Sequence, residues 1–188
     1  MLPKLYDGMK LNYNEQNFWP FQKADYSSVR DFASMFRESN YVTDIPAGTT
    51  GVIVAEKANR MFYNCFALRV IPDALDFTAV DDSLTATFFN CAALEEVRFV
   101  GKITMYINMQ YSGSLSEASV LSLAFALEDG AGFSVTLQNS GNINTIIAES
   151  VKLNAAGDGL EVCDPADPDS LGTLSQYVTN KGWSIMLI

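Results

Sequence analysis

Cys65 and Cys91 are the residues whose type and spacing point most directly to chemistry, because they lie 26 residues apart in similar surroundings. If successive repeats stack, the two thiols come close together, and a disulfide or a redox pair is conceivable. The alternative is that each cysteine is a small buried side chain that fills the same position of its repeat. We favour this alternative because the residues around the two cysteines recur as well. The third cysteine, Cys163, has no evident partner.

Other chemistry is restricted by what the sequence lacks. The chain contains no histidine, no C-x-x-C pair, no P-loop and neither of the motifs G-x-S-x-G and G-x-G-x-x-G. Zinc sites of the common kinds and Ser-His or Cys-His catalysis are therefore largely excluded. We expect no cofactor, no bound metal and no enzymatic activity. A small enzyme that uses two carboxylates stays open, because the chain has 22 acidic residues to supply them.

Two groups of polar residues have alternative interpretations. The stretch CDPADPD contains Asp164, Asp167 and Asp169, and calcium prefers clustered carboxylates. Because its prolines and spacing match no calcium loop, we favour a solvated turn over residues 158–169, with Asp169 as a helix cap. The amides of the recurring Asn64 and Asn90 either contact a ligand or satisfy backbone groups at a turn, and we favour the turn.

The charge of the chain limits its partners. The net charge is -10, from 12 basic and 22 acidic residues, so the chain repels phosphate backbones and we expect no nucleic-acid partner. It has no basic run for an anionic membrane surface, and its longest apolar stretch, 120–127, is too short to span a membrane. No apolar segment follows Lys4, so we expect no signal peptide. The chain would then stay in the cytoplasm as made or leave by assembly into a larger particle such as a virion; the cell surface is the alternative.

Sequence repetition predicts the elements that position these residues. MFRESNYVTDIP (35–46), MFYNCFALRVIP (61–72) and TFFNCAALEEVR (87–98) follow at a 26-residue step. We interpret each unit as a short helix followed by a short strand, with Phe36, Phe62 and Phe88 in the core. In the last unit the strand should direct Val97 and Phe99 inward. Between units, Arg69-Val70 is replaced by Glu95-Glu96.

Beyond residue 113 the period breaks, and the remaining elements follow from local patterns. We expect a helix from a capping box at Ser114, a strand over 133–138 with Phe133, Val135 and Leu137 inward, a helix over 142–153, a strand over 160–163, a helix capped by Asp169 or Ser170 and ended by Gly182, and a strand over 183–187. Residues 1–26 would form an N-terminal cap or a docking segment. Residues 27–188 would form one domain, with regular units to about 112 and divergent repeats with a closing cap over 113–188.

MFYNCFALRVIP and TFFNCAALEEVRF resemble the BspA-like family of bacterial leucine-rich repeats, whose units carry an aromatic residue, a cysteine, L-x-x-I and often proline. The resemblance covers about residues 28–104. The ending YVTNKGWSIML resembles the last repeat of leucine-rich-repeat proteins from phage and prophage genes of gut Bacteroidetes. Membership would imply a short α/β solenoid, with a stacked parallel sheet on one side and short helices on the other, that recognises proteins or glycans.

The outward side of such a sheet is the usual binding surface of a solenoid. The predicted ligand-binding residues on it are Asp44, Val70, Glu96, Arg98, Ser134, Thr136, Gln138 and Ser184, with Met186 beside them. This mildly polar set suits a protein or a carbohydrate better than a small charged metabolite. The function that we expect is a non-catalytic recognition or assembly module, encoded by a phage or mobile element as a structural or host-contact protein. A surface adhesin of BspA type is the alternative, and a carboxylate-dependent enzyme is less favoured.

Overall fold

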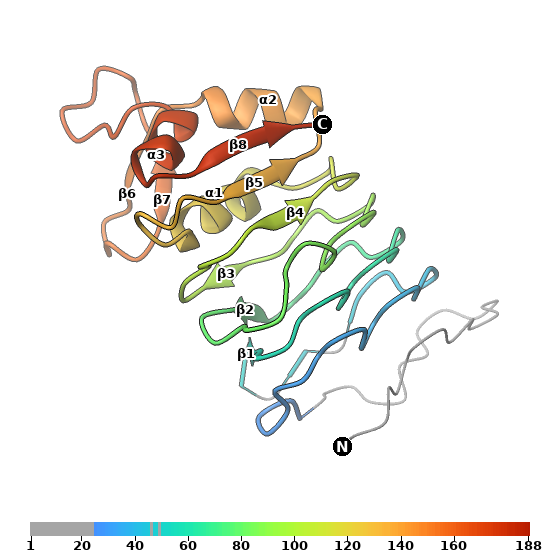
Figure 1. The fold of residues 1–188 in the computed structure, drawn as a ribbon. Coiled ribbons are helices and arrows are strands. Elements are labelled where there is room, and N and C mark those ends of the chain that lie inside the picture. The colour runs from blue at the N-terminus through green and yellow to red at the C-terminus, as the bar shows by residue number, and fades with distance from the viewer. Residues whose placement is uncertain (1–24, 46, 49) are drawn as a thin grey trace.

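The computed structural model describes residues 25–45, 47–48 and 50–188. The predicted N-terminal cap or docking segment, 1–26, therefore lies outside the described residues except for its last two. The described chain has mixed α/β structure, with three short helices (Figure 1). The elements are β1 (Val52–Val54), β2 (Ala74–Asp76), β3 (Phe99–Val100), β4 (Ile107–Met109), α1 (Glu117–Ala126), β5 (Ser134–Leu137), α2 (Gly141–Ala148), β6 (Val151–Leu153), β7 (Leu160–Val162), α3 (Leu174–Asn180) and β8 (Ser184–Leu187).

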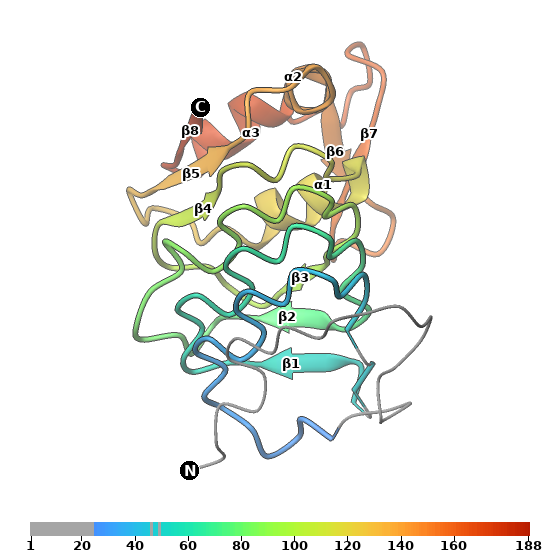
Figure 2. The same cartoon turned by 90° about the vertical axis from the view of Figure 1, so that its right-hand side faces the viewer.

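The 26-residue period of the sequence is also a period in space. Asp44, Val70 and Glu96 are joined by parallel bridges, each to the residue 26 positions further on. In the interior the rings of Phe36 and Phe62 stack at 5.3 Å between centroids, and those of Phe62 and Phe88 at 5.5 Å. Successive coils of the chain therefore lie one above the next, as Figure 2 shows for the lower half of the molecule.

The predicted short helix in each regular unit is wrong, because the described residues before Glu117 contain no α-helix. The reason lies in the hydrogen bonds of the backbone. The N–H of Phe36 donates to the carbonyl of Met61, and the N–H of Phe62 donates to that of Thr87, both at 2.9 Å. A helical N–H donates four residues back instead. The apolar spacing that resembles a helix face comes from turns whose side chains reach the same interior.

Asn64 and Asn90 recur because of the backbone conformation at their positions. Their φ angles are +59° and +61°, in the left-handed region where asparagine is among the more tolerated non-glycine residues. The side chains meet between coils, where Asn90 Nδ2 donates to Asn64 Oδ1 at 3.1 Å. Both asparagines therefore lie at left-handed turn positions, as the turn interpretation predicts, but their amides hydrogen-bond to each other instead of satisfying backbone groups.

Cys65 and Cys91 are free thiols buried in the interior, which confirms the packing interpretation. Cys65 Sγ donates to the carbonyl of Phe36 at 2.8 Å, and Cys91 Sγ donates to that of Phe62 at 3.1 Å. Burial raises the pKa of Cys65 to about 12 and raises the pKa of Cys91 well above its ordinary range. Both thiols therefore stay protonated in the folded chain at neutral and mildly alkaline pH.

We expect alkylation to distinguish Cys163 from the two interior thiols. At pH 8 the folded protein should incorporate one iodoacetamide, at the partly exposed Cys163, because the thiolate is the reactive form. Unfolding in urea should make all three thiols reactive. Mass spectrometry of the intact chain and of its peptides would count and locate the adducts. Rapid labelling of Cys65 or Cys91 under native conditions would contradict the buried assignment.

The C-terminal half contains the helices, and their starts differ from the predicted ones. Helix α1 is capped by Ser116 rather than Ser114. Helix α3 is capped by Thr173, in a reciprocal capping box with Gln176, rather than by Asp169 or Ser170. Helix α2 ends at Ala148, so the last part of the predicted helix 142–153 forms strand β6.

The predicted strands of this half agree better with the structure. Strand β7 lies within 160–163 and β8 within 183–187. Gly182 follows α3 with φ +82°. Val135 and Leu137 are buried as predicted, but Phe133 lies before β5 and is 42% exposed, so its inward assignment is wrong.

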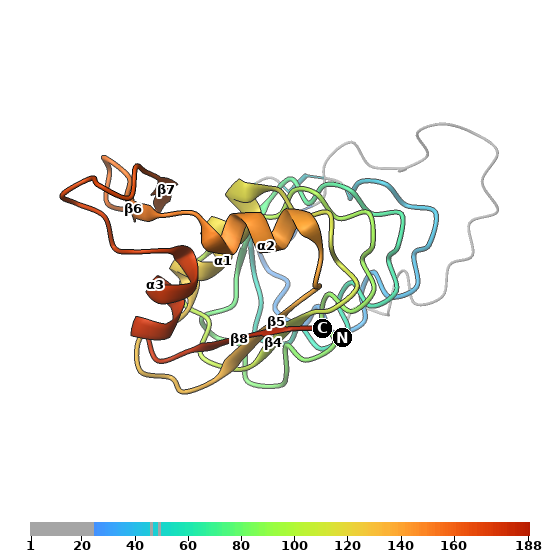
Figure 3. The ribbon, with the colours of Figure 1, turned by 90° about the horizontal axis from the view of Figure 1, so that it is seen from above.

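The strands form three small sheets rather than one continuous face. The orders are β1-β2-β3 and β4-β5-β8, both parallel, and the antiparallel pair β6-β7. Viewed from above, α1 and α2 lie across the interior from β4, β5 and β8 (Figure 3). The buried apolar side chains of the regular coils and of the C-terminal half form one cluster.

Candidate functional site

The eight predicted ligand-binding residues do not form one surface. Asp44, Val70 and Glu96 lie on the column of parallel bridges, and Arg98 lies directly before β3. The remaining four lie on or beside β5 and β8 of the other parallel sheet: Ser134, Thr136, Gln138 and Ser184. As predicted, Glu96 and Arg98 are exposed while Val97 and Phe99 are buried.

The predicted polar residues on or beside the β4-β5-β8 sheet form hydrogen bonds within the protein. Thr136 is fully buried, and its Oγ1 lies 2.7 Å from the hydroxyl of Tyr106, so its prediction as a surface contact is wrong. Gln138 Oε1 accepts from the backbone N–H of Tyr111 at 3.0 Å. The hydroxyl of Ser184 donates to that of Ser134 at 3.0 Å. This sheet therefore presents few unengaged polar groups to a ligand.

Beside the column of bridges, two residues that differ between repeats have complementary charges. Arg69 Nη2 lies 2.7 Å from Glu95 Oε2, one coil further on. The hydrogen bond to the guanidinium lowers the pKa of Glu95, and that to the carboxylate raises the pKa of Arg69. The change from arginine to glutamate between equivalent positions thus joins adjacent coils by an exposed ion pair, whose contribution to stability is small.

A surface strip of aromatic side chains was missed by the sequence interpretation. We call Arg37, Tyr63, Phe89 and Tyr111 the aromatic strip. The Arg37 guanidinium lies 5.8 Å from the Tyr63 ring centroid, and the Tyr63 and Phe89 rings stack at 5.4 Å. Phe89 meets Tyr111 edge to face at 5.3 Å, and Tyr111 is 48% exposed. The strip crosses successive coils and leaves part of each ring accessible to a partner.

The backbone holds the aromatic strip in place. Glu38 donates its N–H to the carbonyl of Tyr63 at 2.8 Å, and Asn64 donates to that of Phe89 at 2.9 Å. The sequence signal that would have found the strip is the aromatic doublet. In Phe62-Tyr63 and Phe88-Phe89 the first ring fills the core, so the second ring points towards the surface. Because the doublets are 26 residues apart, the two surface rings lie on adjacent coils.

A groove of about 650 Å³ lies between β3, α1 and the β6–β7 pair. The predicted Arg98 lines it, together with three carboxylates, from Glu117, Asp158 and Glu161. Leu121 and Phe125 supply apolar lining. The charged side chains of the groove are therefore mainly acidic, with one arginine among three carboxylates.

The acidic stretch after β7 forms a turn with internal contacts. Asp164 Oδ1 accepts from the N–H of Ala166, and Asp167 Oδ1 accepts from that of Asp169. The ammonium of Lys152 lies 2.9 Å from Asp167 and lowers the pKa of that carboxyl group. Across the described ranges, no three or more His, Cys, Asp or Glu residues are grouped as a metal would require.

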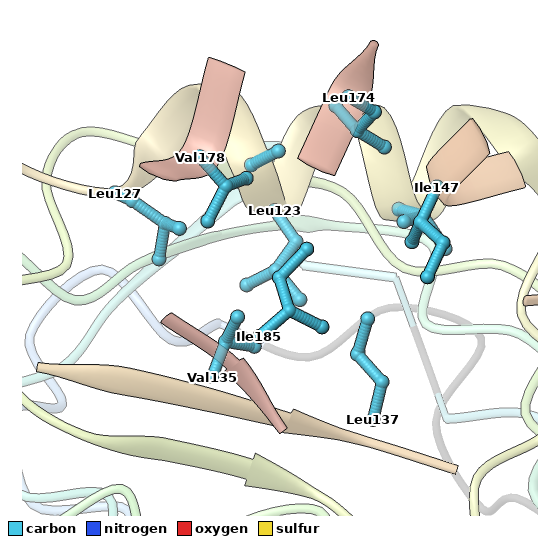
Figure 4. A pocket seen from close by; sticks show the side chains of 10 residues that line it. Leu123, Leu127, Val135, Leu137, Ile147, Leu174, Val178 and Ile185 are labelled. Carbon is cyan, nitrogen blue, oxygen red and sulfur yellow. The ribbon is translucent and has the colours of Figure 1, made fainter. Parts of the chain in front are cut away.

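A small cavity inside the C-terminal half is not a ligand site. It has a volume of about 10 Å³ and lies between α1, α3, β5 and β8. In Figure 4, Val135, Leu137 and Ile185 point into it from the strands, opposite Leu123 and Val178. Every lining residue is apolar, so the cavity offers no hydrogen-bond partner to a ligand or a water molecule.

None of the helices in the described part of the chain is long and apolar enough to cross a membrane. Comparison of the chain with protein-family models, curated proteins and solved structures found no match.

Proposed function

We propose that this chain is a non-catalytic recognition module built as a short leucine-rich-repeat solenoid of BspA-like type, and that the aromatic strip is its contact surface for a protein or a glycan. The parallel bridges and the stacked core rings at the 26-residue step support the solenoid. The strip carries the assignment of the contact surface, because it is the one continuous row of accessible rings that we find across successive coils of the described chain.

The composition of the strip suits recognition. Tyrosine and arginine are enriched among the residues that dominate binding energy at interfaces. Rings that stack on one another lose little conformational freedom when a partner arrives, because they are already ordered. The accessible parts of the rings provide an apolar contact, and the Tyr63 and Tyr111 hydroxyls and the Arg37 guanidinium provide hydrogen-bonding groups beside it.

The biological setting that we propose is a structural or host-contact protein of a phage or mobile element, with a BspA-type surface adhesin as the alternative. The short C-terminal resemblance motivates the first. The position of the gene distinguishes them: a cluster of virion genes supports the first, and a gene elsewhere whose full product is displayed on the bacterial cell supports the second.

The contact surface is tested by comparing two double variants on a glycan and protein array. Tyr63→Ala with Phe89→Ala should weaken binding of any captured partner at least about tenfold, because two central aromatic contacts are removed. The matched control is Glu96→Lys with Arg98→Glu, which alters exposed charges at and beside the column of parallel bridges, where part of the predicted binding surface lies. It should leave binding within about twofold. The reverse pattern would place the contact surface on the column side.

A further inference from the structure

Strand β8 leaves one apolar side chain of an otherwise buried row exposed at one end of the molecule. Met109 in β4, Leu137 in β5 and Leu187 in β8 are paired in register on the interior side of their sheet. Their exposed fractions are 0%, 2% and 40%, so the first two members of the row are buried and the last, Leu187, is not. Figure 3 looks onto this end, where β8 lies beside β5. A further strand beside β8 would cover Leu187.

The outer edge of β8 also carries unused backbone groups. Ser184 and Ile188 donate their N–H groups to the carbonyls of Phe133 and Leu137, both at 3.1 Å. Because bonding directions alternate along a strand, the N–H and C=O groups of the intervening Ile185 and Leu187 point away from β5. Among the described strands, β8 has a neighbour on the β5 side alone.

The elements that form and flank this edge carry no charged side chain, although the chain contains 12 basic and 22 acidic residues. Strands β5 and β8 and helices α2 and α3 contain no Asp, Glu, Lys or Arg. Natural proteins commonly protect an exposed strand edge with such charges. Here Met186 is instead 45% exposed beside the open edge.

We propose that this edge binds a second copy of the chain, with β8 antiparallel to β8 of the other copy. Two molecules that each carry a net charge of -10 repel each other, and a contact through β8 brings together strands that contain no side-chain carboxylate. A two-fold axis at Met186 makes the pairing self-complementary. Ile185 of each copy then exchanges backbone hydrogen bonds with Leu187 of the other, and the two Met186 side chains face each other as a close pair without backbone bonds.

The two-fold arrangement predicts the effect of charge at residue 186. Light scattering over a concentration series should give twice the chain mass of 20.6 kDa for the unaltered protein. Met186→Lys and Met186→Glu should each weaken the dimer at least about tenfold, since like charges would lie opposite each other. An equimolar mixture of the two variants should restore a dimer, which loss of folding could not do. Leu153→Lys, a similarly exposed apolar residue in β6, is the control and should dimerise normally.

Hydrogen exchange of the unaltered protein provides a second test that needs no variant. The amides of Ile185 and Leu187 should exchange more slowly as concentration rises, whereas the amides at the tip of the β6–β7 pair should not change. A monomer at every concentration would overturn the proposal. A dimer that Met186→Lys does not weaken, or polymers that grow beyond two copies, would overturn it equally, because each would place the contact elsewhere.

Discussion

Replacement of Phe62 by alanine is expected to lower the free energy of unfolding by about 3–5 kcal/mol, the range for deletion of a buried aromatic side chain. The Phe62 side chain is fully buried and lies between the rings of Phe36 and Phe88, at 5.3 and 5.5 Å. Its loss leaves a cavity that two adjacent coils border. Because small domains are stable by only about 5–15 kcal/mol, this loss is a large fraction of the free energy of unfolding. Urea denaturation followed by circular dichroism measures the change.

The neighbouring Tyr63 supplies the matched control. Its ring belongs to the same kind of stack, 5.4 Å from Phe89, but it is partly exposed on the surface. Tyr63→Ala should lower the free energy of unfolding by about 1 kcal/mol, since it removes a partly exposed aromatic pair and leaves no cavity in the core. The two variants thus separate stability from recognition. Equal destabilisation by both would show that the assignment of interior and surface rings is wrong.

The interior was predictable from the sequence because every coil must fill the same space. Phe36, Phe62 and Phe88 recur for that reason, and so do the two buried cysteines. Because the same interior position in each coil needs a side chain of similar size and polarity, the same residue type recurs. The 26-residue spacing alone therefore identifies these positions. The alternation of Val97 and Phe99 with exposed neighbours was predictable in the same way.

The backbone of the regular coils was not predictable from local pattern. The N–H of Phe36 finds its acceptor in Met61, on the next coil. Apolar residues at intervals of three and four fit a helix, but they fit successive inward turns as well. The interpretation of the recurring Asn64 and Asn90 as turn residues is evidence against a helix, because a helix interior disfavours the left-handed conformation that both adopt.

The predicted site failed at the point where the period ends. Beyond residue 113 the 26-residue period ends, so spacing could not show which residues align with Glu96 or Arg98. The structure places Ser134 and Thr136 on a separate sheet. Thr136 is then covered through its contact with Tyr106, which precedes β4. No spacing rule relates these two residues. The aromatic strip, by contrast, lies within the periodic region, where the aromatic doublets Phe62-Tyr63 and Phe88-Phe89 indicate it.

The second large effect is expected at Gly101, which has φ +69° and contacts hydrogen-bonded neighbours. A Cβ atom there would collide with Asp76 Oδ1 and Thr78 Oγ1. Neither oxygen is free to move, because Asp76 Oδ1 accepts from the N–H of Thr78 at 2.9 Å and Thr78 Oγ1 accepts from that of Lys102 at 2.8 Å. Gly101→Ala should therefore cost about 1–2 kcal/mol for the left-handed backbone and about 1–3 kcal/mol more for the displaced contacts.

Gly51 isolates the two contributions, because it has nearly the same backbone angle, φ +68°, and no atom of the described residues lies within 4 Å of an added Cβ. Gly51→Ala should show the backbone cost alone, about 1–2 kcal/mol. Urea denaturation measures the loss in free energy of unfolding for each variant. Faster hydrogen exchange at the Thr78 and Lys102 amides in Gly101→Ala, but not in Gly51→Ala, would show that the additional loss arises at these contacts. If the two variants lose equal stability, the side chains of Asp76 and Thr78 do not form a fixed contact between β2 and β3. A larger loss at Gly101 would mean that this contact helps to hold adjacent coils in register.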